Sequence, residues 1–136
     1  MSTFKAFYKE NRKQAETIKV KATKNFVDEK GEVLDWEVRK LTSKEGDEIR
    51  EACTVLESDG TTYIDNNLLS SKIAATCTVY PDLNDKGLQD SYGVMGAEAL
   101  LKELINLDGE YQNYVNTVMV IADYKSVNEL REQVKN

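Results

Sequence analysis

The sequence predicts an α+β domain in which a β-hairpin packs against several α-helices in two layers. Two observations predict it: apolar and polar residues alternate between residues 17 and 40, and apolar residues recur at helical spacing after residue 42. The chain has 136 residues. This length fits one domain over residues 1–136, which buries about two-thirds of its unfolded surface. The 40% apolar content is enough for a core without metal or disulfide support.

Residues 17–40 predict the hairpin, with one face buried. The apolar positions that share this face are Ile18, Val20, Ala22, Phe26, Leu34, Trp36 and Val38. A three-residue loop over 29–31, whose glycine takes the left-handed conformation, places Phe26 opposite Leu34 and Ala22 opposite Val38. A four-residue loop would split the apolar faces, so the shorter loop is preferred.

The segments on either side of the hairpin predict helices. Ser2 or Thr3 can cap a short helix ending near Asn11, with three aromatic residues on one face. After the hairpin, Thr42 and Glu45 form a capping box. The aromatic residues of the first helix are Phe4, Phe7 and Tyr8. The helix that begins at Thr42 ends before Asp59-Gly60, and residues 61–64 are a candidate third strand.

Four further helices are predicted in the second half. Asp65 or Asn66 caps the first of them, and its apolar stripe runs to Tyr80 before Pro81 ends it. The other three are expected from Asn84 to Gly93, from Ala97 to Leu107, and from a cap at Asp108 to Ala122. The segment from about 124 onward is expected to be a mobile tail with widely spaced apolar positions.

The composition argues against several classes of function. A net charge of −6 disfavours a nucleic-acid binder, and the absence of histidine removes the commonest catalytic base and zinc ligand. Cys53 and Cys77 cannot complete a zinc site and are interpreted as core residues, although their spacing does not exclude a disulfide. Residues 82–87 imitate a calcium loop, but Lys86 and Gly93 stand where ligands are needed. We therefore expect no enzyme activity, cofactor or metal.

The N-terminal residues and the short length of the apolar runs predict a cytoplasmic protein. The first residues lack the apolar core of a signal peptide. The longest apolar run, Val118 to Ala122, is too short to cross a bilayer.

Tyrosines in the second half suggest a partner surface. Tyr80, Tyr92, Tyr111 and Tyr114 lie at predicted helix ends, where they either close the core or anchor a partner helix. We expect Tyr111, Tyr114 and Val118 to contact a partner, together with the amphipathic segment 127–134.

Several segments together resemble the XkdN-like phage tail assembly chaperones. The longest is Tyr80 to Gly96, followed by residues 97–103; the others are residues 26–31, 34–38, 42–53, 100–103 and 109–111. The resemblance covers roughly residues 4–120. The sequence departs from the family between Val55 and Tyr63, which is short, and at Asp108, where proline is usual. The segment beyond Asp123 has no clear counterpart.

The resemblance implies a non-enzymatic chaperone that binds the phage tape measure protein during tail morphogenesis. Such proteins act in the bacterial cytoplasm and are absent from the mature virion. The implied partners are the tape measure protein, other tail proteins, a frameshifted longer form and a further copy of the chain, without nucleic acid or membrane. An acidic host-interaction protein, such as a DNA-mimicking inhibitor, is the alternative that the negative charge leaves open.

Overall fold

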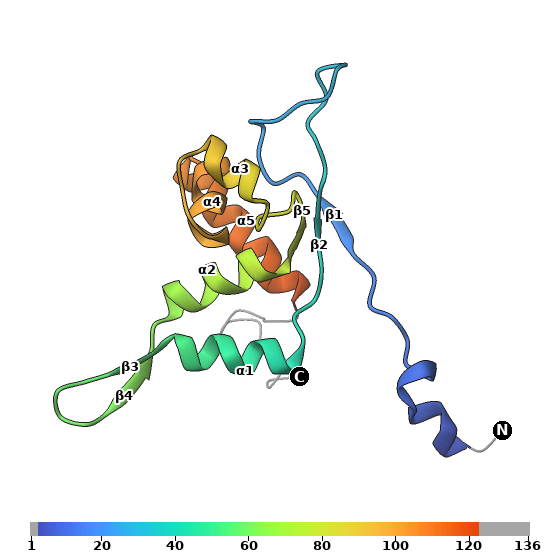
Figure 1. Ribbon diagram of the computed structural model, residues 1–136, viewed down its shortest axis with the longest axis vertical. Helices are drawn as coiled ribbons and strands as arrows, with labels where there is room; N and C mark the ends of the chain where they lie inside the picture. The colour runs from blue at the N-terminus through green and yellow to red at the C-terminus, as the bar shows by residue number, and fades with distance from the viewer. Residues whose placement is uncertain (1–2, 123–136) are drawn as a thin grey trace, which may run out of the picture.

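A computed structural model describes residues 3–122 and shows an α+β fold, as predicted (Figure 1). The strands are β1 (Ile18–Val20), β2 (Trp36–Val38), β3 (Thr54–Leu56), β4 (Thr62–Ile64) and β5 (Thr78–Tyr80). The α-helices are α1 (Ser43–Ala52), α2 (Asn66–Cys77), α3 (Lys86–Ser91), α4 (Ala97–Leu104) and α5 (Asp108–Ile121). Two short 3-10 helices, η1 (Thr3–Phe7) and η2 (Lys9–Asn11), precede them.

Three segments project from a body made of helices (Figure 1). The N-terminal arm, residues 3–17, leads away from β1. The first hairpin, residues 18–38, extends past the body in the opposite direction. The second hairpin, formed by β3 and β4, projects from the end of α1.

The main sheet is antiparallel with the strand order β1-β2-β5. Its third strand is therefore β5, and the candidate strand at 61–64 belongs to a separate two-stranded sheet with β3. The prediction that Tyr80 continues a helical stripe was wrong, because α2 ends at Cys77. The chain then extends and pairs with the open edge of β2, and the backbone N–H of Arg39 donates to the carbonyl of Cys77 at 2.9 Å.

The tip of the first hairpin has the predicted three-residue loop. Gly31 has φ +83°, and the N–H of Leu34 donates to the carbonyl of Phe26 at 2.9 Å. The Asp28 carboxylate also accepts hydrogen bonds from two backbone N–H groups of the loop. This local chemistry fixes the register at the tip.

Nearer the body the predicted register was wrong. Ile18, and not Ala22, lies opposite Val38. The intervening residues leave the ladder because α5 binds them: the Thr23 hydroxyl and the Lys24 N–H both donate to the Glu110 carboxylate, at 2.9 and 3.2 Å. The Asn25 amide donates to the Leu104 carbonyl at 2.9 Å. Side-chain partners far away in the sequence thus displace the strand.

The core lies between the main sheet and the helices. Trp36 and Val38 are buried from the sheet side, while Ile18 at the far end stays 42% exposed. From the helices, α2 packs against α1, α4 and α5. The fully buried large side chains on the helical side are Ile73, Leu83, Leu100, Leu101, Ile105 and Val118.

The helix starts mostly follow the predicted caps. The capping box of Thr42 and Glu45 is present, and Asp65 caps α2. For two helices the observed cap position differs from the predicted one by one residue. Asp85 rather than Asn84 caps α3, and Asp108 is the first residue of α5, whose cap position Leu107 supplies no side-chain hydrogen bond.

Candidate partner-binding groove

The residues predicted to face a partner lie inside the protein. Tyr111, Tyr114 and Val118 are 7%, 3% and 0% exposed. The hydroxyl of Tyr111 donates to Ser71 at 3.0 Å, and that of Tyr114 lies 2.6 Å from the hydroxyl of Thr78. These three residues fill the core stripe of α5, so they offer no surface to a partner in this conformation. The segment 127–134, predicted to bind with them, lies outside the described residues.

The other two tyrosines of the predicted set lie at an apolar groove. Its volume is about 170 Å³. The lining residues are Phe26, Leu34, Trp36, Tyr80, Pro81, Leu88, Tyr92 and Leu104. Trp36 is 2% exposed, and Tyr80 and Tyr92 are 53% and 37% exposed. Trp36 therefore forms part of the buried floor, and the two tyrosines lie at the rim.

The fold brings these groove residues together from four elements. Phe26 and Leu34 come from the first hairpin, which is held over the helices by Glu110. Tyr80 ends β5 and is followed by a cis peptide bond to Pro81. The remaining side of the groove comes from α3 and α4.

Polar contacts hold the α3 side of the groove. The Asp85 carboxylate accepts from the N–H of Leu88 at 2.8 Å and caps the helix. Gln89 joins the loops on both sides of α3, because its amide donates to the Leu83 carbonyl at 2.8 Å and accepts from Gly96 N–H at 3.2 Å. The acidic residues of the calcium-like segment are thus used as caps and turns.

The lining of the groove has no charged residue, but the chain segments that supply Leu88 and Leu34 to it are acidic. Residues 82–90 contain three aspartates and one lysine, and residues 28–35 contain four acidic residues and one lysine. Asp35 is paired with Lys21 at 2.9 Å. A basic or neutral apolar ligand therefore suits this surface better than an acidic one.

Buried ionisable groups in the structure are held in their neutral form. Desolvation raises the pKa of the Cys77 thiol to about 11 and raises the pKa of Cys53 as well. Both cysteines are free. Desolvation also raises the pKa of Tyr114 to about 12. Because a thiol reacts as the thiolate, neither cysteine is activated as a nucleophile.

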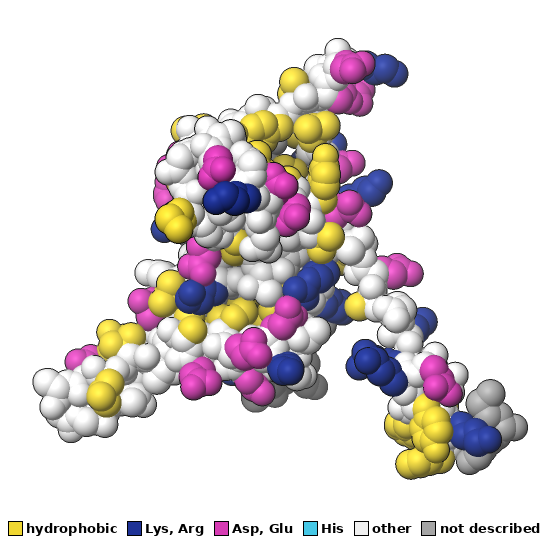
Figure 2. Space-filling model, in the orientation of Figure 1, with side chains coloured by type: hydrophobic (Ala, Val, Ile, Leu, Met, Phe, Trp, Pro, Cys, Tyr) yellow, Lys and Arg dark blue, Asp and Glu magenta, His cyan; other side chains and the backbone are white. Residues whose placement is uncertain are grey.

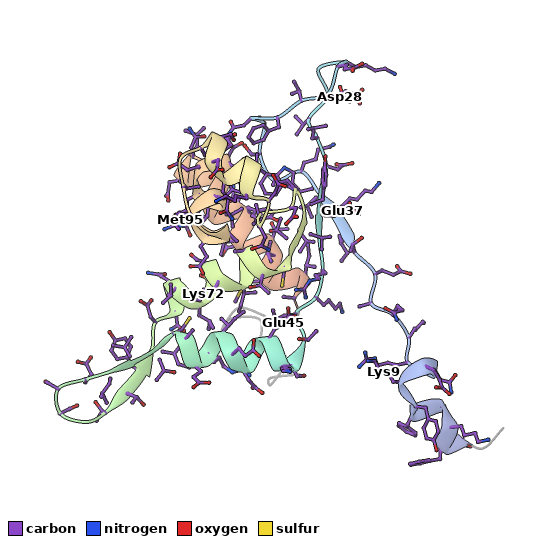
Figure 3. The ribbon with its side chains drawn as sticks, in the orientation of Figure 1. Lys9, Asp28, Glu37, Glu45, Lys72 and Met95 are labelled. Atoms are coloured by element: carbon purple, nitrogen blue, oxygen red, sulfur yellow. The ribbon has the colours of Figure 1, made fainter. Side chains whose placement is uncertain are left out.

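A second hollow of about 740 Å³ opens between the start of α2 and the start of α4. Met95 lies at its edge and is 92% exposed (Figure 3). Beside it, Lys72 and Glu98 form an ion pair at 2.9 Å. The lining consists mainly of polar and small residues and includes none of the aromatic side chains that line the groove.

Within residues 3–122, no group of three or more Cys, Asp or Glu residues is placed to hold a metal ion. In the same part of the chain, no helix is long and apolar enough to cross a membrane.

A profile of the phage XkdN-like tail assembly chaperone proteins matches residues 4–135. The chain belongs to this family. The XkdN protein of the phage-like element PBSX from Bacillus subtilis is 30% identical over 135 residues, covering 90% of this chain and 86% of that protein. The uncharacterised protein YqbN from the same organism is 28% identical with the same coverage. The crystal structure of YqbN has the same fold, with a TM-score of 0.77 at 24% identity over 92% of this chain and 99% of the other.

For an XkdN-like chaperone, the signature segment from Tyr80 to Gly96 now has a structural role. It supplies the rim tyrosines and the α3 wall of the groove. The family match also extends past Asp123, so the expectation that this end lacks a counterpart was wrong. Sequence reasoning missed most of the groove, because it assigned Tyr80 to the apolar stripe of α2, which ends at Cys77. Tyr92, beside Gly93, belonged to no predicted stripe.

Proposed function

We propose that the protein is a non-enzymatic tail assembly chaperone that binds the tape measure protein during tail morphogenesis. It acts in the bacterial cytoplasm and leaves before the virion is complete. The observation that carries the proposal is an aromatic groove built on the signature segment of a tail assembly chaperone family. Other tail proteins or a frameshifted form of the chain are further candidates for partners.

The size of the groove suggests how a client would bind. A cavity of about 150 Å³ accommodates one benzene ring, so a groove of about 170 Å³ receives one large apolar side chain. A client helix would insert this anchor against Trp36 and lay its flanking residues on Tyr80 and Tyr92. An extended apolar protein needs such masking until it is enclosed by the tail.

The chemistry of the chain supports a role without catalysis. It has no histidine, and its two thiols are buried with raised pKa values. Its groove is apolar and aromatic, which is typical of a site that recognises an apolar side chain.

Co-expression with the tape measure protein of the same gene cluster tests the proposal. Tyr80→Lys places a charge at the groove rim and should reduce co-purification at least tenfold. Tyr63→Lys is the matched control, because Tyr63 is 48% exposed on β4, away from the groove, against 53% for Tyr80. Equal binding by both variants and the wild type would show that the client does not use the groove.

A further inference from the structure

The N-terminal arm carries a preformed aromatic cluster that no described part of the chain covers. Phe4, Phe7 and Tyr8 are 68%, 79% and 50% exposed. The ring of Phe4 lies 6.1 Å from the ring of Phe7 and 6.1 Å from that of Tyr8. The amide of Asn11 donates to the carbonyl of Lys5 at 2.7 Å, which joins η2 to η1. An ordered, exposed apolar patch of this kind is typical of a binding element.

The arm also carries the opposite charge from the groove walls. The arm, residues 3–17, contains four Lys or Arg residues and two Glu, whereas residues 28–35 and 82–90, which supply Leu34 and Leu88 to the groove, carry net negative charge. Figure 2 shows the arm with yellow aromatic side chains next to dark blue basic ones. The arm therefore offers an aromatic ring to an apolar groove and positive charge to the acidic segments beside it.

The direction of β1 keeps the arm away from the groove of its own chain. Ile18 pairs with Val38 at the end of β2 that is remote from the hairpin tip, and the arm continues in that direction. The groove lies toward the tip, where Phe26 and Leu34 line it. Figure 3 shows Asp28 at the tip of the first hairpin and Lys9 on the arm, beyond the other end of that hairpin.

We propose that the arm of one copy docks into the aromatic groove of a second copy. One phenyl ring, from Phe4 or Phe7, enters beside Trp36, and the basic residues of the arm face the acidic segments 28–35 and 82–90 beside the groove. The contact is head-to-tail, because arm and groove are different surfaces, so it builds either a ring or an open row of copies. The proposal concerns the protein without a client and does not rest on the tape measure protein being that client.

Sedimentation of the full chain over a wide concentration range tests the proposal. The wild type should associate, and Phe4→Ser/Phe7→Ser should shift the association to at least tenfold higher concentration. Leu56→Ser is the control, because Leu56 is 71% exposed on the second hairpin. Trp36, the only tryptophan, reports on the groove, so its emission should change with concentration in the wild type and not in the arm variant.

A mixing experiment identifies the two surfaces. Tyr80→Lys/Tyr92→Lys blocks the groove and leaves the arm intact, whereas the arm variant keeps its groove. Each alone should be monomeric, with an unchanged circular dichroism spectrum, and an equimolar mixture should form one-to-one dimers. A monomeric wild type would overturn the proposal, and so would association that survives loss of the arm. A compact monomer that expands when the arm is changed would also overturn it, because the arm would then bind its own groove.

Discussion

The hydroxyl groups of Thr78 and Tyr114 lie 2.6 Å apart in the interior and join the start of β5 to α5. The Thr78 hydroxyl also donates to the Ala74 carbonyl at 2.7 Å. Its single proton is therefore used toward Ala74, and Tyr114 donates to Thr78. The two hydroxyl groups therefore differ in their hydrogen bonds: that of Thr78 has two partners, and that of Tyr114 has one.

Removing the Tyr114 hydroxyl and removing the Thr78 hydroxyl should therefore lower the free energy of unfolding by different amounts. Tyr114→Phe removes one neutral hydrogen bond and leaves Thr78 bonded to Ala74, which should cost about 1 kcal/mol. Thr78→Val leaves the buried Tyr114 hydroxyl without an acceptor and should cost about 1–3 kcal/mol. Urea unfolding of both variants measures the difference. A larger loss for Tyr114→Phe would contradict this assignment of the donors.

The same tyrosine should weaken the fold at alkaline pH. Desolvation raises the pKa of Tyr114 to about 12, whereas an unfolded tyrosine has a pKa of about 10. Because the pKa of Tyr114 is higher in the folded state than in the unfolded state, the contribution of the neutral hydroxyl to the free energy of unfolding is complete below about pH 10. That contribution is lost as the pH rises through about 12. The loss should be ~2–3 kcal/mol. Tyr114→Phe is the control for other groups that titrate there, and it should show a smaller loss over the same range.

The ion pair between Arg39, which follows β2, and Glu45 on α1 should show the opposite pH dependence. Arg39 binds the Glu45 carboxylate through two hydrogen bonds of 2.8 and 2.7 Å. This contact and those from Thr42 lower the pKa of Glu45 to about 2. Since the pKa of Glu45 is lower in the folded state than in the unfolded state, the contribution of the ionised carboxylate to the free energy of unfolding is complete above about pH 4.5. That contribution is lost as the pH falls through about 2.

Glu45→Gln isolates this ion pair, because glutamine can still complete the capping box with Thr42. Both side chains are about one-third exposed, so solvent screening limits the cost to about 1 kcal/mol. The difference in stability from the wild type should be seen at pH 7 and should shrink as the pH falls from 4.5 toward 2. A difference that stays constant with pH would assign the effect to capping.

The local features of the fold were predictable because their causes are local. Gly31 and Asp28 fix the hairpin tip, and Thr42 and Glu45 fix the start of α1. The register near Ala22 was not predictable, because Glu110 on α5 pulls the intervening residues out of the ladder. Nothing within the hairpin sequence signals this contact.

The burial of Tyr111, Tyr114 and Val118 differs from the prediction that they face a partner, for a related reason. Tyr111 and Tyr114 lie on the same stripe as Val115 and Val118, and this stripe packs into the core. A complete apolar stripe is better interpreted as core than as interface. The groove instead combines hairpin, β5, α3 and α4 residues, and sequence periodicity cannot bring four separate elements to one place.

Trp36 links the stability of the fold to the groove. Its ring lies 5.3 Å from that of Tyr114 in an edge-on arrangement, and its side chain is 2% exposed. Trp36→Ala should cost on the order of 3–5 kcal/mol, because it leaves a cavity between sheet and helices. Thermal melting of this variant measures the loss, and Tyr92→Ala at the exposed rim should cost much less.

Glu110 should control the shape of the groove from outside it. Its carboxylate holds the Thr23 hydroxyl and the Lys24 N–H, and so fixes the hairpin segment that leads to Phe26. Glu110→Ala removes two hydrogen bonds to a charged acceptor and leaves the buried Thr23 hydroxyl without this partner, at a cost of about 2–3 kcal/mol. Hydrogen exchange should accelerate at residues 22–26 while the interior of α5 stays protected. Glu103→Ala on the exposed side of α4 is the matched control. Unchanged exchange at residues 22–26 would mean that Asn25, through the carbonyl of Leu104, holds the hairpin alone.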